Sequence, residues 1–136
     1  MTTRILDASV AAAWYLPESF SAKAKAWQRR MLDGDVGFLV PRLHYWELAN
    51  VLRTYVRRRE ITAALALDIY ALHLHAPLEV AEPAPDDVLK LALEHATMAY
   101  DAVYIALAIA HNIPIVTGER PTTPWVASLG PLAEPL

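Results

Sequence analysis

The chain has 136 residues, 55% of them hydrophobic, and a formal net charge of −3 from 12 basic and 15 acidic side chains. This length and apolar content suit one domain with its own core, residues 1–136, and exclude a disordered chain. No apolar run approaches the roughly 18 residues of a membrane span and no secretory signal is found, so we expect a cytoplasmic protein. The absence of cysteine excludes disulfides and thiolate metal sites.

Short apolar runs alternate with helix-type patterns along the chain. The predicted elements are, in order, a strand at residues 4–7, helices at 10–16 and 19–32, a strand at 36–41, helices at 42–60 and 61–75, a strand at 77–82, helices at 84–97 and 99–111, a strand at 112–119, and a short helix and edge strand in the proline-rich tail. Pro17 ends the first helix, Ser19 or Ser21 caps the second, and Thr62 caps the fourth. Short, uniformly apolar strands are typical of a parallel sheet with helices on both faces.

Four acidic residues fall where such a sheet places binding sites, beyond the carboxyl ends of its strands. Asp7 ends the first predicted strand, and Glu119 ends the predicted strand at residues 112–119. Glu47 lies in the first two turns of the long third helix, which follows a strand. Asp101 opens a helix and stands directly before nine consecutive apolar residues. We therefore expect these four carboxylates to converge on one edge of the sheet.

Four converging carboxylates repel one another unless a cation neutralises them. Mg²⁺ and Mn²⁺ prefer oxygen ligands, and a bound metal can activate water and stabilise the leaving oxygen in phosphodiester hydrolysis. This pattern predicts a carboxylate-bound Mg²⁺ or Mn²⁺ site. Each acid also has an ordinary interpretation: a helix cap for Asp101, turn residues for Asp7 and Glu119, and a solvated helix position for Glu47.

Four segments match one protein family in order and spacing: ILDASVAAAWYLPE at residues 5–18, ELANVL at 47–52, YDAVYIALA at 100–108 and IPIVTGE at 113–119. With these motifs the chain resembles the PIN-domain nucleases, most closely the VapC-type toxins of toxin–antitoxin pairs, over nearly its whole length. The resemblance implies a small three-layer α/β/α sandwich with a short, mainly parallel sheet. It also implies a Mg²⁺- or Mn²⁺-dependent endoribonuclease that forms a homodimer and is inhibited by a cognate antitoxin.

The resemblance further implies roles for individual residues. The catalytic acids that bind the metal match Asp7, Glu47, Asp101 and, at the fourth position, Glu119. Polar groups that orient ligands or water match Ser9, Asn50 and Thr117. Hydrogen bonding to the backbone is the alternative role for Ser9 and Thr117. At the fourth acid position the family usually has aspartate, and the longer Glu119 side chain would reach a metal directly or through water.

A basic cluster ends the long helix at residues 42–60. Arg53, Arg57, Arg58 and Arg59 lie within seven residues, and the first three are candidate RNA-binding residues because arginine suits bidentate phosphate contacts. A solvated, basic helix end is the ordinary interpretation. Without the four proposed site acids, 11 acidic side chains face 12 basic ones, so the net acidity does not exclude RNA.

Two other functions stay open at this stage. One is an RNA-processing nuclease that has no antitoxin, and a neighbouring gene for a DNA-binding antitoxin would distinguish the toxin from it. The other is a catalytically weak PIN-like module that binds RNA or protein, which metal-dependent cleavage would exclude. The five histidines form no zinc-like pattern, because His73 and His75 are two residues apart on a helix and point to different faces.

Overall fold

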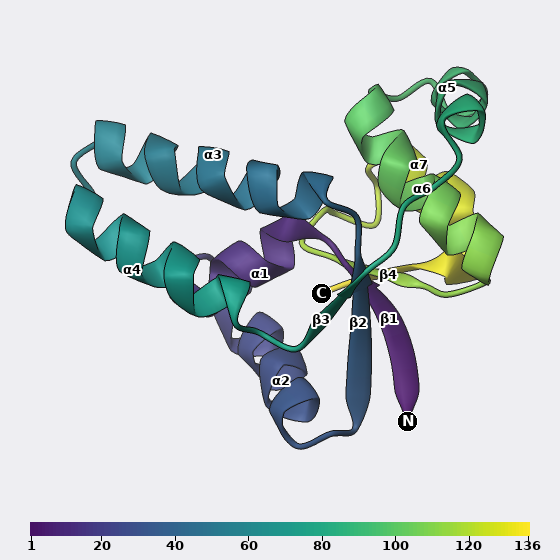
Figure 1. The fold of residues 1–136 in the computed structure, drawn as a ribbon. Coiled ribbons are helices and arrows are strands. Elements are labelled where there is room, and N and C mark those ends of the chain that lie inside the picture. Colours follow the sequence, from purple (N-terminus) through teal and green to yellow (C-terminus); the bar gives the residue numbers. More distant parts are fainter.

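One sheet of five parallel strands lies at the centre of the protein in the computed structural model, which describes residues 1–136 (Figure 1). The strands are β1 (Thr2–Leu6), β2 (Val36–Val40), β3 (Leu78–Val80), β4 (Ile115–Thr117) and β5 (Ala133–Pro135). Their order across the sheet is β3-β2-β1-β4-β5, and every neighbouring pair is parallel. All carboxyl ends therefore lie on one edge, and β1 stands at the centre of that edge.

Helices cover both faces of this sheet. They are α1 (Ala8–Tyr15), α2 (Ser21–Leu32), α3 (Leu43–Arg57), α4 (Ala63–Leu74), α5 (Pro85–Glu94), α6 (Ala99–His111) and α7 (Pro124–Leu129). Leu6 and Phe38 pack with α1 and α2 on one face, whereas their chain neighbours Ile5 and Leu39 pack with α6 and α7 on the other. Because successive strand residues point to opposite faces, uniformly apolar strands can fill both layers. The predicted three-layer α/β/α sandwich is confirmed.

Helices α3 and α4 form an antiparallel hairpin that packs against α1 (Figure 1). Leu48, Leu52 and Ile69 pack there against Ala12 and Leu16 in a separate apolar cluster. A buried row of hydrogen bonds also joins the hairpin to the sheet through His44 on α3 and His73 on α4. This packing fixes the first turns of α3 against the carboxyl end of β1.

Local signals at the helix ends had mixed outcomes. Thr62 caps α4 as predicted, because its hydroxyl accepts a hydrogen bond from the N–H of Leu65 at 3.1 Å. The predicted serine cap of α2 is wrong, since the cap residue is Phe20. The Ser21 hydroxyl instead donates to the carbonyl of Leu16, which closes the turn between α1 and α2. None of the helices has both the length and the apolarity needed to cross a membrane.

Candidate functional site

Asp7 lies at the carboxyl end of the central strand, at the first turn of α1. Its Oδ2 atom accepts two hydrogen bonds, from the Thr117 hydroxyl at 2.7 Å and from the Ser9 hydroxyl at 3.0 Å. Thr117 ends β4, which pairs directly with β1. Burial raises the pKa of the Asp7 carboxyl, the two hydroxyls oppose that rise, and the charges of Glu119 and Asp101 add to it. Asp7 is therefore a carboxylate whose charge the protein itself does not neutralise.

Glu47 lies in the second turn of α3, half-buried. The Tyr104 hydroxyl, from α6, donates a hydrogen bond to its Oε1 atom at 2.6 Å. Burial raises the pKa of Glu47 to about 7, the Tyr104 hydrogen bond acts against this rise, and the charges of Asp7 and Asp101 add to it. These electrostatic effects link three acids that come from three different elements.

Asp101 lies in the first turn of α6, where the helix dipole favours negative charge. The Thr97 hydroxyl donates to its Oδ2 atom at 2.7 Å. The residue that caps α6 is Met98, and no side chain bonds to the free N–H groups of that end. The interpretation of Asp101 as the helix cap is therefore wrong.

Asp7, Glu47 and Asp101 share one pattern of hydrogen bonding. In each, one carboxylate oxygen accepts from protein hydroxyls, and the other accepts no hydrogen bond from the protein. No fully buried side-chain oxygen lacks a partner, so these second oxygens are not completely enclosed by the protein. The two ion pairs of the protein, Arg4–Glu134 and Arg42–Glu82, involve none of these acids.

This donor set fits a hard divalent cation in its chemistry. It offers carboxylate oxygens only, which Mg²⁺ and Mn²⁺ prefer, and it lacks any protein cation that would compete for them. In this arrangement, however, no group of three or more acidic or histidine side chains is close enough together to hold a metal ion. Instead, Asp7, Glu47 and Asp101 each accept a hydrogen bond from a protein hydroxyl.

Glu119 differs from the other three acids. Its side chain is exposed, and its Oε2 atom lies 3.3 Å from the Thr123 hydroxyl in the loop before α7. Its backbone N–H donates to the Thr117 hydroxyl at 3.1 Å and so supports the contact between Thr117 and Asp7. Its charge raises the pKa of Asp7 and not that of Glu47. Glu119 thus lies at the rim of the site, on the Asp7 side.

The three polar residues named from the sequence have different places. Ser9 and Thr117 both contact Asp7, and the Ser9 hydroxyl also accepts from the N–H of Gly118 at 3.0 Å. Asn50 is exposed, and its side chain makes no hydrogen bond within the protein. The structure therefore brings the first two to the acids and leaves Asn50 outside their hydrogen-bond network.

Two hydroxyl residues of this site were missed in the sequence. Tyr104 stands three residues after Asp101 on the same face of α6, and Thr97 stands four residues before Asp101, in the connection that precedes the helix. That spacing is the signal that points to them. The partner of Tyr104, Glu47, is 57 residues away and could not be inferred from spacing.

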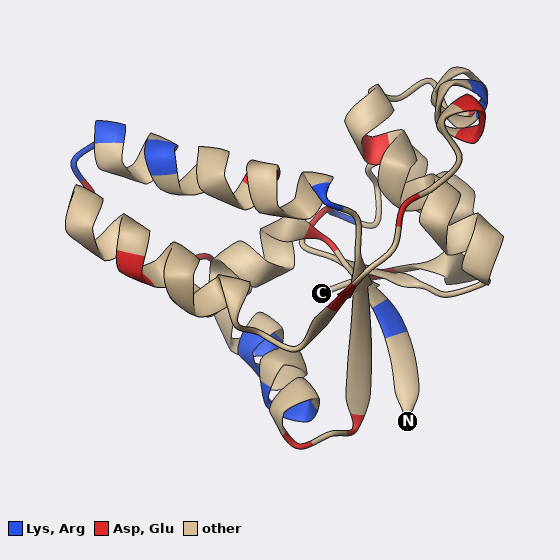
Figure 2. Cartoon of the chain, viewed as in Figure 1, with Lys and Arg blue, Asp and Glu red and all other residues tan.

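The basic cluster lies away from the acids, at the far end of α3 (Figure 2). Arg53 and Arg57 line an apolar groove of about 470 Å³ between α3 and α4, together with Leu52 and Tyr70. Arg58 follows at the end of the helix and is exposed. The structure does not bring these arginines into contact with the site acids.

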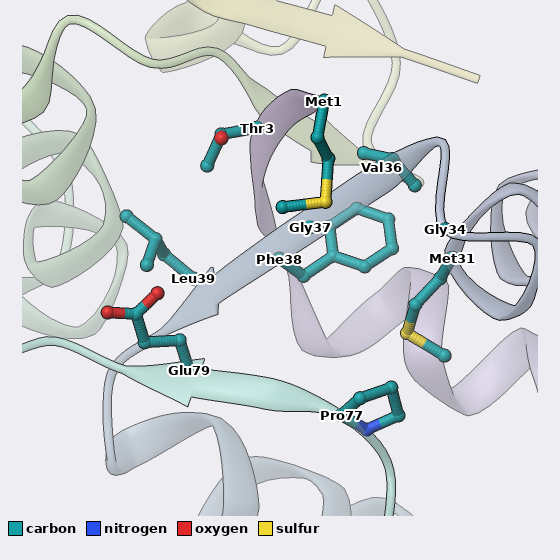
Figure 3. A pocket seen from close by; sticks show the side chains of 10 residues that line it. All are labelled: Met1, Thr3, Met31, Gly34, Val36, Gly37, Phe38, Leu39, Pro77 and Glu79. Carbon is teal, nitrogen blue, oxygen red and sulfur yellow. The ribbon is translucent and has the colours of Figure 1, made fainter.

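A second cavity, of about 280 Å³, opens at the opposite end of the sheet (Figure 3). Met1, Val36 and Phe38 line it, and Glu79 is its only carboxylate. The Met1 side chain lies over Gly37 there, at the amino ends of β1 and β2. This cavity contains none of the acids discussed above, so the chemistry of the site is confined to the carboxyl edge.

Comparisons with known proteins give consistent results. The family model described as PIN domain matches residues 4–120. Ribonuclease VapC3 of Pyrobaculum aerophilum is 35% identical over 129 residues, which cover 85% of this chain and 88% of that protein. The crystal structure of PAE2754 from Pyrobaculum aerophilum matches with a TM-score of 0.74 and 23% identity, over 98% of this chain and 90% of that one. Mycobacterium tuberculosis VapC20, described as a sarcin-ricin loop cleaving toxin, matches with a TM-score of 0.63 and 14% identity, over 95% of each chain. At these low identities, the two structural matches bear on the fold alone.

Proposed function

This chain belongs to the PIN domain family, and we propose on that premise that it is a Mg²⁺- or Mn²⁺-dependent endoribonuclease, the toxin of a toxin–antitoxin pair. Residues 1–136 would form a single nuclease domain. The observation that carries the proposal is the shared pattern of Asp7, Glu47 and Asp101. In each, one oxygen accepts from a hydroxyl, the other is unpaired and not fully buried, and the carboxylate forms no ion pair with a protein cation.

The acids have distinct parts in this proposal. Asp7, Glu47 and Asp101 would hold the metal through their free oxygens, and Glu119 would act at the rim, directly or through water. The metal, when bound, supplies activation of water and charge stabilisation at the leaving oxygen of the RNA phosphodiester. Ser9 and Thr117 fix the direction of the Asp7 carboxylate, since both donate to the same oxygen. Asn50 has no role that its surroundings support.

The RNA contacts are proposed from chemistry and exposure. Trp46 precedes Glu47 and has 67% of its surface exposed, so it offers an aromatic face on which a base can stack. Arg53, Arg57 and Arg58 would contact phosphates farther along the strand. As a VapC-type toxin the protein would act in the cytoplasm, form a homodimer and be inhibited by a cognate antitoxin.

The proposal is tested by cleavage of a mixed RNA pool with the purified protein. We expect cleavage with Mg²⁺ or Mn²⁺, none in excess EDTA, and recovery when metal is added back. Asp101→Asn is the control for a contaminating nuclease, because it removes one acid of the site and keeps the side-chain shape. Equal cleavage in EDTA, or by Asp101→Asn protein, overturns the proposal. RNA binding without cleavage would identify the catalytically weak module instead.

A further inference from the structure

The Tyr104 hydroxyl is a buried group at the centre of the acid site. Only 4% of the Tyr104 surface is exposed, and its ring packs in the core beneath α6 with Ile105 and Leu107. A buried phenol needs a hydrogen-bond partner, and here that partner is the Oε1 atom of Glu47 at 2.6 Å. Core packing therefore fixes the Tyr104 hydroxyl, and this hydroxyl fixes the Oε1 atom of the more exposed Glu47.

This hydroxyl joins two of the helices that carry the site acids. Tyr104 is on α6, three residues after Asp101, and its partner Glu47 is on α3. Burial raises the pKa of Tyr104, and the charges of Asp7, the residue directly before α1, and of Glu47 add to this rise. No other side-chain hydrogen bond at the acid site joins α3 to α6.

We propose that Tyr104 is a positioning residue for metal binding: its hydroxyl holds Oε1 of Glu47 and so presents Oε2 to a divalent cation shared with Asp7 and Asp101. This inference rests on the proposed function, because it requires that the acids bind a metal. Without the hydroxyl, the Glu47 side chain regains rotamer freedom, and part of the binding free energy is spent on ordering it again. Removing a partner that orients a metal ligand typically weakens metal affinity by 10- to 100-fold.

The test is Mn²⁺ binding measured by calorimetry on Tyr104→Phe protein in the absence of RNA. Phenylalanine keeps the ring in the core and deletes only the hydroxyl. We expect the Mn²⁺ dissociation constant to rise by about tenfold. In cleavage assays we expect kcat to fall at low Mn²⁺ and to recover at high Mn²⁺, with the KM for RNA unchanged.

Tyr55→Phe is the matched control. The Tyr55 hydroxyl donates to the Oε1 atom of Glu18 at 2.7 Å, which is the same tyrosine–glutamate hydrogen bond on α3 but outside the site. We expect both variants to lose some thermal stability and only Tyr104→Phe to lose Mn²⁺ affinity. Equal Mn²⁺ affinity in the two variants overturns the proposal and leaves Tyr104 as a structural tyrosine.

A double-mutant cycle asks whether Tyr104 acts through Glu47. In a Glu47→Gln background, Tyr104→Phe should weaken Mn²⁺ binding by much less than it does in the parent protein. An undiminished effect contradicts positioning through Glu47. If the parent binds Mn²⁺ but cleaves no RNA, the nuclease function fails while the positioning role is still decided by binding. If the parent binds no Mn²⁺, both proposals fail.

Discussion

The Nε2 atoms of His44 and His73 lie 2.9 Å apart in the interior, so one ring donates a hydrogen bond to the other. His44 Nδ1 faces the carbonyl of Leu6 at 3.1 Å and must carry a hydrogen, which leaves its Nε2 as the acceptor when the ring is neutral. His73 Nε2 then donates, and its Nδ1 accepts from the Tyr15 hydroxyl at 2.7 Å. A proton added to His44 Nε2 or to His73 Nδ1 removes a hydrogen-bond acceptor, because the first accepts from His73 and the second from Tyr15.

Acid should destabilise the fold through these two rings. Burial lowers the pKa of His44 to about 3, with a smaller contribution from the charge of His73, and burial lowers the pKa of His73 to about 4. Below the ordinary histidine pKa of 6.5, the unfolded chain takes up protons that the folded protein does not. The free energy of unfolding should therefore fall by about 2 kcal/mol per histidine between pH 7 and pH 5, as measured by urea unfolding.

The carboxylates change stability in the opposite direction, so this measurement needs a control. The pKa of Glu47 is raised from 4.5 to about 7, so the folded protein binds this proton more tightly than the unfolded chain does. The Glu47 contribution to the free energy of unfolding therefore rises as pH falls from 7 towards 4.5. A His44→Gln, His73→Gln double variant removes only the histidine contribution. The difference between parent and variant should shrink as pH falls. A difference that stays constant with pH would show that these rings do not titrate in this way.

Asp7→Asn should abolish cleavage and stabilise the protein without metal. Burial disfavours the charged Asp7 carboxylate, as its raised pKa indicates. Asparagine removes the charge and keeps one oxygen, which is sufficient because Ser9 and Thr117 donate to the same atom. We expect cleavage to fall by roughly 100-fold or more and the urea midpoint to rise. A lower midpoint would assign Asp7 a structural role.

Mn²⁺ affinity should rise with pH between 6 and 8. Glu47, with a pKa of about 7, must lose its proton before it binds a cation, and Asp7 adds to this requirement. We expect the affinity to rise about fivefold from pH 6 to pH 7 and about tenfold from pH 6 to pH 8, where it levels off. Calorimetry in buffers of different ionisation enthalpy would count the protons released. Glu47→Gln protein should release fewer protons, and equal release would contradict the assignment to Glu47.

Glu119→Gln should weaken Mn²⁺ binding less than Asp101→Asn does. The Glu119 side chain is exposed and faces Thr123, whereas Asp101 affects the pKa values of both Asp7 and Glu47. Glu119→Asp should keep measurable activity. The comparison is a Mn²⁺ titration of the cleavage rate for all three variants. If Glu119→Gln matches the parent at every Mn²⁺ concentration, Glu119 is a turn residue only.

Replacing Arg57 and Arg58 by glutamine should weaken RNA binding and flatten its salt dependence. For a single strand, each phosphate that the protein no longer binds should reduce the slope of log affinity against log salt by roughly 0.7. Lys25→Gln with Arg29→Gln is the control, because it removes the same charge from exposed positions on α2. Equal slopes in the two double variants would assign the α3 arginines to a solvated or protein-binding surface.

The sheet was predictable because its signal is local. Each strand is short and the central ones contain runs of apolar residues, so patterning located all five strands, the weak tail strand included. The Thr62 cap was predictable because it needs only the N–H of Leu65, three residues on. The Ser21 cap failed because the Ser21 oxygen accepts a hydrogen bond from the backbone N–H of Glu18, at 2.9 Å, and not from an N–H in the first turn of α2.

The site was predictable only in part. Strand ends locate Asp7, and helix starts locate Glu47 and Asp101, because parallel strands share one carboxyl edge. The hydroxyl partner of an acid was not predictable where the two residues are far apart in the sequence, as Tyr104 and Glu47 are. The same is true of His44 and His73, which are 29 residues apart. Pairings of this kind depend on the packing of α3 against α1 and α6, which composition and periodicity do not contain.

The central place of β1 bears on protein synthesis. The hydrogen bond from Thr117 to Asp7 spans 110 residues, and β1 pairs with β4 only after α5 and α6 have been made. On a translating ribosome, β1, β2 and β3 are made before Thr117, which is one of the two hydroxyl donors to Asp7. A nascent chain that ends before Thr117 therefore lacks a complete acid site. For a protein that would cleave RNA, this order keeps activity away from the ribosome that makes it until translation of the domain is almost finished.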